Sequence, residues 1–119
     1  MRVYEIIKTT VNGWCTAHGL VPRAEFATID GNLPERYLLY SVVSSLADAW
    51  YGDRRDRVAN RVQLDIVVPM HDGYMLPTLY AELLEQMMAA GHIPAGNYRI
   101  SRDDKSGKAY CQADFFVYE

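Results

Sequence analysis

The stretch "RVQLDIVV", residues 61–68, decides how this chain folds, because it alternates apolar and polar side chains with a period of two. In an extended chain its aliphatic and polar residues point to opposite sides, with Val62, Leu64, Ile66 and Val68 facing Arg61, Gln63 and Asp65 across the backbone. This pattern predicts a strand with one face in a hydrophobic core and one polar face. The neighbouring segments must supply the rest of the sheet and its cover.

Four other segments are expected to form strands. "RYLLYSVVSSL", residues 36–46, is apolar on both faces, which favours a strand covered on both sides. "AEFATI", residues 24–29, is short and precedes turn residues, so it predicts a brief strand. "NYRIS" and "KAYCQADFFVY" flank residues 103–107, an acidic, glycine-containing turn, and predict a closing hairpin.

Two segments have the periodicity of helices. The first runs from Arg2 to about His18, and Gly13 within it is a position where the helix could end early. The second lies between Leu76 and Met88, with a wide apolar face. Gly91 and Pro94 then provide a stop signal.

The order is helix, strands, helix, hairpin, which favours an α+β fold. We expect a mainly antiparallel sheet of about four to five strands, flanked by the N-terminal helix and by the helix between strands. The chain of 119 residues is expected to form a single domain over residues 1–119.

Composition narrows the class of protein. Half of the residues are hydrophobic and 23% are charged, as in ordinary globular domains. No apolar run approaches the ~20 residues of a membrane span, and the N-terminus lacks a signal-peptide core. We therefore expect a cytosolic protein without membrane contact, in which Cys15 and Cys111 stay free thiols.

Charge is segregated along the chain. The segment from Asp53 to Arg61 carries a net charge of +2, so the remainder carries −5 within a total of −3. This favours an oriented contact over a general polyanion-binding surface. Arginine and aromatic residues are enriched in protein interfaces, and the candidate contact residues in this loop are Trp50, Tyr51, Arg54, Arg55 and Arg57.

No group of residues has the spacing of a catalytic, metal or cofactor site. The three histidines, His18, His71 and His92, have no second ligand nearby, and His71 beside Asp72 is expected to be a solvated loop histidine. Glu82 and Glu85 are expected on a solvated helix face. Phosphate-binding glycine motifs are missing. We expect a protein that is not an enzyme and needs no cofactor or metal.

Three segments occur in the order "PERYLLYSVVSS" (residues 34–45), "NRVQLDIVV" (60–68) and "GKAYCQADFFVYE" (107–119), and a Tyr- and Leu-rich helix is expected after the second. In this order they resemble strands of the small tail-terminator or tail-completion proteins of long-tailed bacteriophages. The resemblance covers residues 34–119. The family also has an N-terminal helix, but Pro77 and the segment "AGHIPAG" are departures from its pattern.

The resemblance implies a structural protein of the virion that is assembled in the host cytoplasm. Such a protein forms a homo-oligomeric, six-fold ring on the tail tube, ends tail polymerisation and joins the head connector at the neck. Genomic DNA would pass through the lumen without sequence-specific binding. A ring needs one surface of each copy to dock onto a different surface of the next. The arginine loop would supply one such surface, and the turn residues Asp103, Asp104 and Lys105 would contact the tube or connector.

Two other functions remain open. One is a head-closure or neck protein of the same particle. The other is a small nucleic-acid-binding α+β module, in which Tyr37, Tyr40 and the arginines would stack on bases and contact phosphates. Strong salt-dependent binding to DNA or RNA would favour this second alternative.

Charge reversal of the loop arginines tests the first surface. A variant with Arg54, Arg55 and Arg57 all changed to Glu is expected to weaken ring assembly, because the local positive charge would no longer meet acidic surface on the next copy. Ring assembly at physiological salt, measured by electron microscopy, checks this. Normal assembly of the triple variant would exclude the loop as the joint.

Overall fold

The computed structural model describes residues 2–24, 34–47 and 58–118. The elements follow one another as α1 (Arg2–Ala17), β1 (Val21–Ala24), β2 (Tyr37–Ala47), β3 (Val58–Pro69), the 3₁₀ helix η2 (Met70–Met75), α2 (Leu76–Ala89), β4 (Ile93–Pro94), β5 (Arg99–Asp103) and β6 (Lys108–Tyr118). No described helix has both the length and the apolar character needed to cross a membrane.

The strands form one sheet in the order β1-β2-β3-β6, with β4 and β5 both paired to the far edge of β6. Every pairing is antiparallel except that of β1 with β2. The expected α+β fold with a mainly antiparallel sheet and two flanking helices is confirmed. The two-residue strand β4 was not expected, because its sequence, Ile-Pro, is too short to carry a periodic signal.

Strand β3 lies at the centre of the sheet. It pairs with β2 from Val58 to Val67 and with β6 from Ala59 to Pro69. Its aliphatic side chains Val62, Leu64 and Ile66 are fully buried in the core. The polar residues between them are only partly buried, so the predicted alternation is confirmed.

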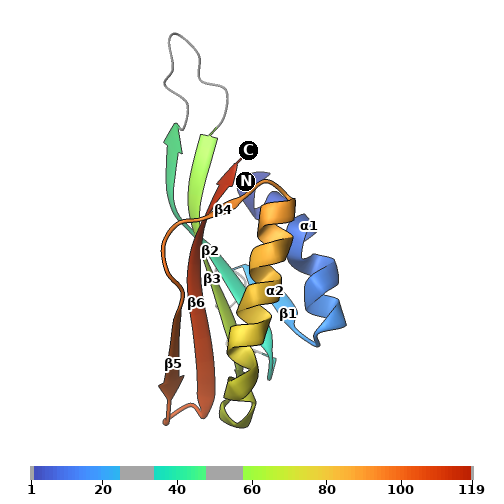
Figure 1. Ribbon diagram of the computed structural model, residues 1–119, viewed down its shortest axis with the longest axis vertical. Coiled ribbons are helices and arrows are strands. Elements are labelled where there is room, and N and C mark those ends of the chain that lie inside the picture. Colours follow the sequence, from blue (N-terminus) through green and yellow to red (C-terminus); the bar gives the residue numbers. More distant parts are fainter. Residues whose placement is uncertain (1, 25–33, 48–57, 119) are drawn as a thin grey trace.

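Both helices lie on the same face of the sheet (Figure 1). Side chains of both pack in one cluster with those of β2, β3 and β6, for example Ile7 of α1, Leu83 of α2 and Phe115 of β6. Helix α1 continues through Gly13 without a break. We refer to the opposite side of the sheet, which neither α1 nor α2 covers, as the open face.

Strand β2 was expected to be buried on both faces of the sheet, and this is true only at its start. Tyr37 and Leu38 point to opposite faces, and both are buried. Val43 is 56% exposed, at a point where the pairing with β3 shifts by one residue. The prediction is wrong there, because Val43 follows the core-facing Val42 and therefore points to the face that neither helix covers.

The first strand lies earlier than expected. It spans Val21–Ala24, whereas the predicted strand began at Ala24, and residues 25–29 fall outside the described part of the chain. Pro22 is part of this strand and pairs with Leu38. Proline is accepted here because β1 is an edge strand, where one side of the backbone needs no donor.

Gly91 ends helix α2 as predicted. Its φ is +89°, and the N–H groups of Gly91 and His92 donate to the carbonyl oxygens of Met88 and Met87 at 3.0 Å each. This pair of hydrogen bonds forms the Schellman C-cap, which needs a residue with a left-handed backbone conformation at this point.

Two glycine-to-alanine substitutions test this backbone assignment. Gly91→Ala is expected to lower the free energy of unfolding by about 1 kcal/mol, because its φ is costly for a residue with a Cβ. Gly13→Ala is the matched control, since a Cβ there meets nothing within 4 Å inside a helix. It is expected to stabilise by up to about 1 kcal/mol. Urea unfolding followed by circular dichroism measures both, and equal effects of the same sign would contradict the assignment.

Candidate subunit interface

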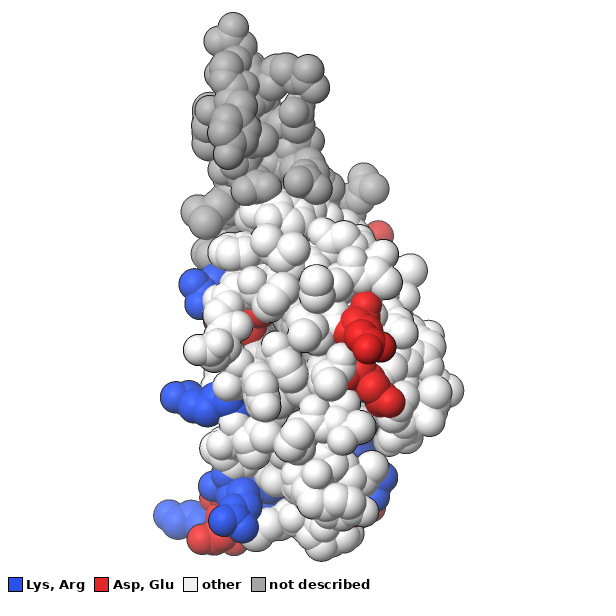
Figure 2. Space-filling view, viewed as in Figure 1, with Lys and Arg blue, Asp and Glu red and all other residues white. Residues whose placement is uncertain are grey.

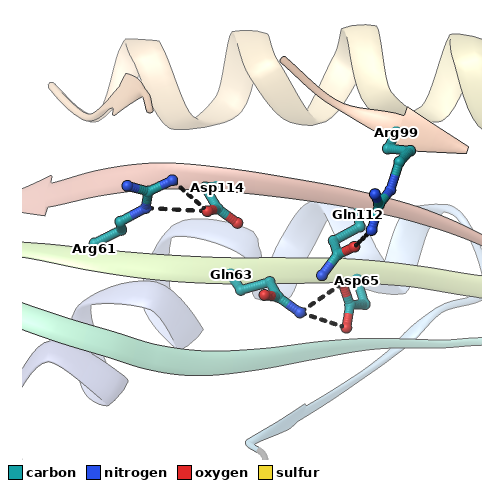
Figure 3. A network of polar contacts seen from close by, with 6 residues as sticks. All are labelled: Arg61, Gln63, Asp65, Arg99, Gln112 and Asp114. Carbon is teal, nitrogen blue, oxygen red and sulfur yellow. Dashed lines mark hydrogen bonds and ion pairs between the residues drawn. The ribbon is translucent and has the colours of Figure 1, made fainter. Parts of the chain in front are cut away.

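A polar network occupies the open face of the sheet, formed by side chains of β3, β5 and β6 (Figure 3). We name it the open-face network, and its residues are Arg61, Gln63, Asp65, Arg99, Gln112 and Asp114. The six side chains converge because β3 is paired to β6 and β6 to β5 in register. They include two cations and two carboxylates, so the network has no net charge.

The ion pair between Arg61 and Asp114 is the closest contact in this network. The guanidinium donates through Nε and Nη2 to the same carboxylate oxygen, Oδ2, at 3.1 and 2.9 Å. Arg61 lies directly opposite Phe116 in the register, so its side chain reaches diagonally to Asp114. At the other side of β6, Arg99 donates to Gln112 at 3.2 Å.

Asp65 has a partly buried carboxyl group within the network. Burial raises the pKa of its carboxyl group above the ordinary value, and the nearby carboxylate of Asp114 raises it further. Gln63 acts in the opposite direction, because its amide donates to both carboxylate oxygens at 3.3 and 3.4 Å. The ionised form of Asp65 is therefore less favourable in the folded protein than in the unfolded chain.

A polar hollow of about 330 Å³ borders the network where residues 95–99 pass beside β6. Its lining includes Arg61, Arg99 and Asp114. The carboxylate of Asp114 is already occupied by Arg61, and the lining contains no histidine, cysteine, serine or threonine. The remaining donors and acceptors of this lining suit hydrogen bonding to another protein surface.

The turn between β5 and β6 contains the second group of predicted contact residues. Asp103 shapes the turn, since its side chain accepts from the Lys105 N–H at 3.0 Å and its carbonyl from the Gly107 N–H at 2.9 Å. Gly107 has a φ of +69°. The side chains of Asp104 and Lys105 are exposed at the tip, where a partner could reach them.

Apolar side chains are exposed on the helix side of the sheet beyond α2. Tyr74 is 79% exposed, Tyr98 42% and Ile100 40%. The ring of Tyr98 stacks on Tyr80 of α2 with 4.1 Å between centroids. A hollow of about 700 Å³, lined by Tyr74, Ile100 and Arg102 among others, lies between η2 and β5. It exists because the single helix α2 does not extend over β5.

The predicted arginine loop falls almost wholly outside the described residues. This holds for Trp50, Tyr51, Arg54, Arg55 and Arg57, so their contact role stays a prediction. One part of that expectation needs correction. Residues 58–61 of the charged segment belong to β3, and Arg61 is an ion-pair partner of Asp114.

The remaining candidate residues have structural partners. Asp72 is buried and forms an ion pair with Arg36, which ties η2 to the start of β2, whereas the side chain of His71 is 75% exposed, as a solvated histidine should be. Tyr37 and Tyr40 are 8% and 5% exposed, so neither offers its ring as a platform for a base.

Outside the network, Nε2 of His18 lies 2.7 Å from a carboxylate oxygen of Glu82. Cys15 and Cys111 are free and buried, and burial raises their pKa to about 12 and about 11. Within the described ranges, no three His, Cys, Asp or Glu residues are placed to hold a metal ion.

Sequence reasoning missed Arg99, Arg102, Tyr98 and Ile100 as surface residues of interest. Their segment was correctly predicted as a strand, but its position at the sheet edge was not. A signal was present in the high charge of β5, because two arginines and an aspartate in five residues are typical of an edge strand.

The substitution Asp65→Asn tests whether the partly buried carboxylate destabilises the fold. Because the folded pKa of Asp65 is raised, the folded state binds its proton more tightly than the unfolded chain, and ionised Asp65 destabilises the fold at pH 7. Asp65→Asn is therefore expected to raise the free energy of unfolding at pH 7. This gain should shrink as the pH falls through the folded pKa toward the unfolded value of about 4.

Urea unfolding at pH 7 and pH 4 measures this difference. Asp114→Asn is the matched control, since it removes a carboxylate that Arg61 pairs, and it is expected to destabilise at pH 7 by up to about 1 kcal/mol. A loss of stability at pH 7 in the Asp65 variant would contradict the electrostatic account.

Comparison with known proteins adds no family to these observations. No protein-family model matches this chain, and no curated protein matches it either. The likeness to tail-terminator proteins therefore stands on the three strand motifs, and function must be inferred from these and from the described surfaces.

Proposed function

We propose that this protein is a tail terminator of a long-tailed bacteriophage. It would form a homo-oligomeric ring, six-fold by analogy with the family it resembles, on the end of the tail tube. The ring would end tube polymerisation and provide the joint to the head connector. The protein would then act as a structural component of the virion neck, assembled in the host cytoplasm, and not as an enzyme.

The observation that carries this proposal is the position of the three motif segments. Residues 34–45, 60–68 and 107–119 supply most of β2, β3 and β6, which are neighbours at the centre of the sheet. The helix expected after the second motif is α2, and α1 takes the place of the N-terminal helix. Segments that resemble a family in sequence thus fold together into one unit with the α+β architecture that the resemblance implies.

The surfaces also support a structural role. The open face presents fixed hydrogen-bonding groups, and the β5 side presents exposed apolar and charged side chains. Such mixed surfaces are typical of protein contacts. The partners in this proposal are further copies of the chain, the tail-tube protein and the head–tail connector. DNA would pass through the ring lumen without base-specific contacts.

A head-closure protein would also form a ring, but it would bind the head connector and would not end the tail tube. The nucleic-acid alternative loses its proposed stacking residues, because Tyr37 and Tyr40 are buried. The arginines at positions 54, 55 and 57 lie outside the described residues, so their part of it stays a prediction. Neither alternative is favoured by a further observation of the described surfaces.

Polymerisation of the tail-tube protein of the same phage tests the proposal. When this protein is added, tubes are expected to stop at a narrow length distribution and to carry a distinct density at one end in negative-stain microscopy. The control is tube protein alone, which should give broad lengths. Unchanged lengths and bare ends, together with binding to isolated connectors, would move the assignment to a head-closure protein.

A further inference from the structure

We infer that neighbouring copies in the proposed ring are joined by a head-to-tail contact between the β5 side of one copy and the outer face of α2 of the next. This inference rests on the proposed ring and specifies its joint. The occupant of the β5 side is thus a second copy of this chain.

The first surface is the β5 side, defined by Tyr98, Arg99, Ile100, Arg102 and Lys105. All five are exposed. Across residues 99–108 there are four Lys or Arg residues and two Asp residues, so this hairpin has a net charge of +2. Figure 2 shows basic side chains along the left edge of the described part of the molecule, with acidic side chains among them at the lower end.

The second surface is the outer face of α2, defined by Glu82 and Glu85. These two glutamates are the only charged residues of the helix, which therefore has a charge of −2. Figure 2 shows acidic side chains gathered over the helical layer, away from the basic edge. His18, which follows the end of α1, contacts Glu82 at 2.7 Å, so Glu82 already has a partner within its own copy. Glu85 forms no ion pair within the described chain and is exposed.

The two surfaces carry opposite charge on different elements, with Arg102 and Lys105 in the β5 hairpin and the two glutamates on α2. A copy cannot satisfy its own β5 side with its own α2 face, but it can satisfy that of a neighbour. Contacts of this kind use two different patches, so each copy keeps one of each available, and the assembly closes into a ring when the rotation between copies allows it.

Apolar burial would add to this charge attraction. Ile100 and Tyr98 project among the cations of the β5 side, and each is about two-fifths exposed. On the receiving side, a hollow of about 450 Å³ between α1 and the end of α2 is lined by Ile6, Thr10 and Ala90 among others. Aromatic and aliphatic residues placed among charges in this way are typical of interface centres and their polar surround.

Sedimentation velocity of the isolated chain tests this contact. At about 0.01 M ionic strength the wild-type chain is expected to self-associate as concentration rises, and at about 1 M it should dissociate, because the screening length falls from about 30 Å to about 3 Å. Arg102→Glu and Glu85→Lys should each weaken association at least about tenfold. Lys8→Glu is the control, since it reverses an exposed cation of α1 outside both surfaces and should leave association unchanged.

Mixing the two reversed variants provides the decisive measurement. In an equimolar mixture, every junction can again join opposite charges, so association should return to near the wild-type level. A mixture that stays dissociated overturns the inference, and so does a wild-type chain that stays monomeric at every concentration. Tight binding of β5 to DNA, lost in Arg102→Glu and strengthened in Glu85→Lys, would overturn it in favour of a nucleic-acid surface.

Tube capping separates this inference from the proposed function. If Arg102→Glu caps tubes as well as the wild type does, the joint lies elsewhere while the terminator function holds. If the charge-dependent association is present and tubes are never capped, the contact is correct and the terminator function fails. Circular dichroism and thermal melts establish that each variant is folded.

Discussion

Burial of alternate side chains of β3 is the constraint on which the rest of the structure depends. Val62, Leu64 and Ile66 lose all solvent contact only when helices lie over one face of the sheet and neighbouring strands pair on both sides. Because the side-chain period of a strand is two, a register slip of one residue would turn Arg61, Gln63 and Asp65 into that core. Because burying these polar side chains would be unfavourable, β2 and β6 pair with β3 in a single register, and this fixes the rest of the sheet.

The same alternation explains why charged side chains gather on the open face. Each polar residue of β3 must share that face with those of β6, so Arg61 meets Asp114 and Asp65 lies near Gln112. Partial burial makes an isolated charge costly, and ion pairing or amide donation offsets part of that cost. Within the described residues, Asp65 accepts from the Gln63 amide and has no cation beside it, and the pKa of its carboxyl group is raised.

Unequal cover of the sheet gives the molecule two distinct sides. Two helices cannot extend over six strands, so β5 remains outside α2 with exposed apolar and basic residues, while α2 presents its glutamates outward. A head-to-tail assembly requires this kind of asymmetry, because identical patches would pair copies into closed dimers.

The sequence by itself determined the local structure. Period-two alternation in residues 61–68, helical spacing in α1 and α2, and the glycines at positions 91 and 107 specify elements through interactions between near neighbours. The tertiary structure alone decided that β1 begins at Val21, that Arg61 pairs with Asp114, that Tyr37 and Tyr40 are buried, and that β5 is an edge strand. These features depend on contacts between residues far apart in the chain, whose partners and strand order no local pattern encodes.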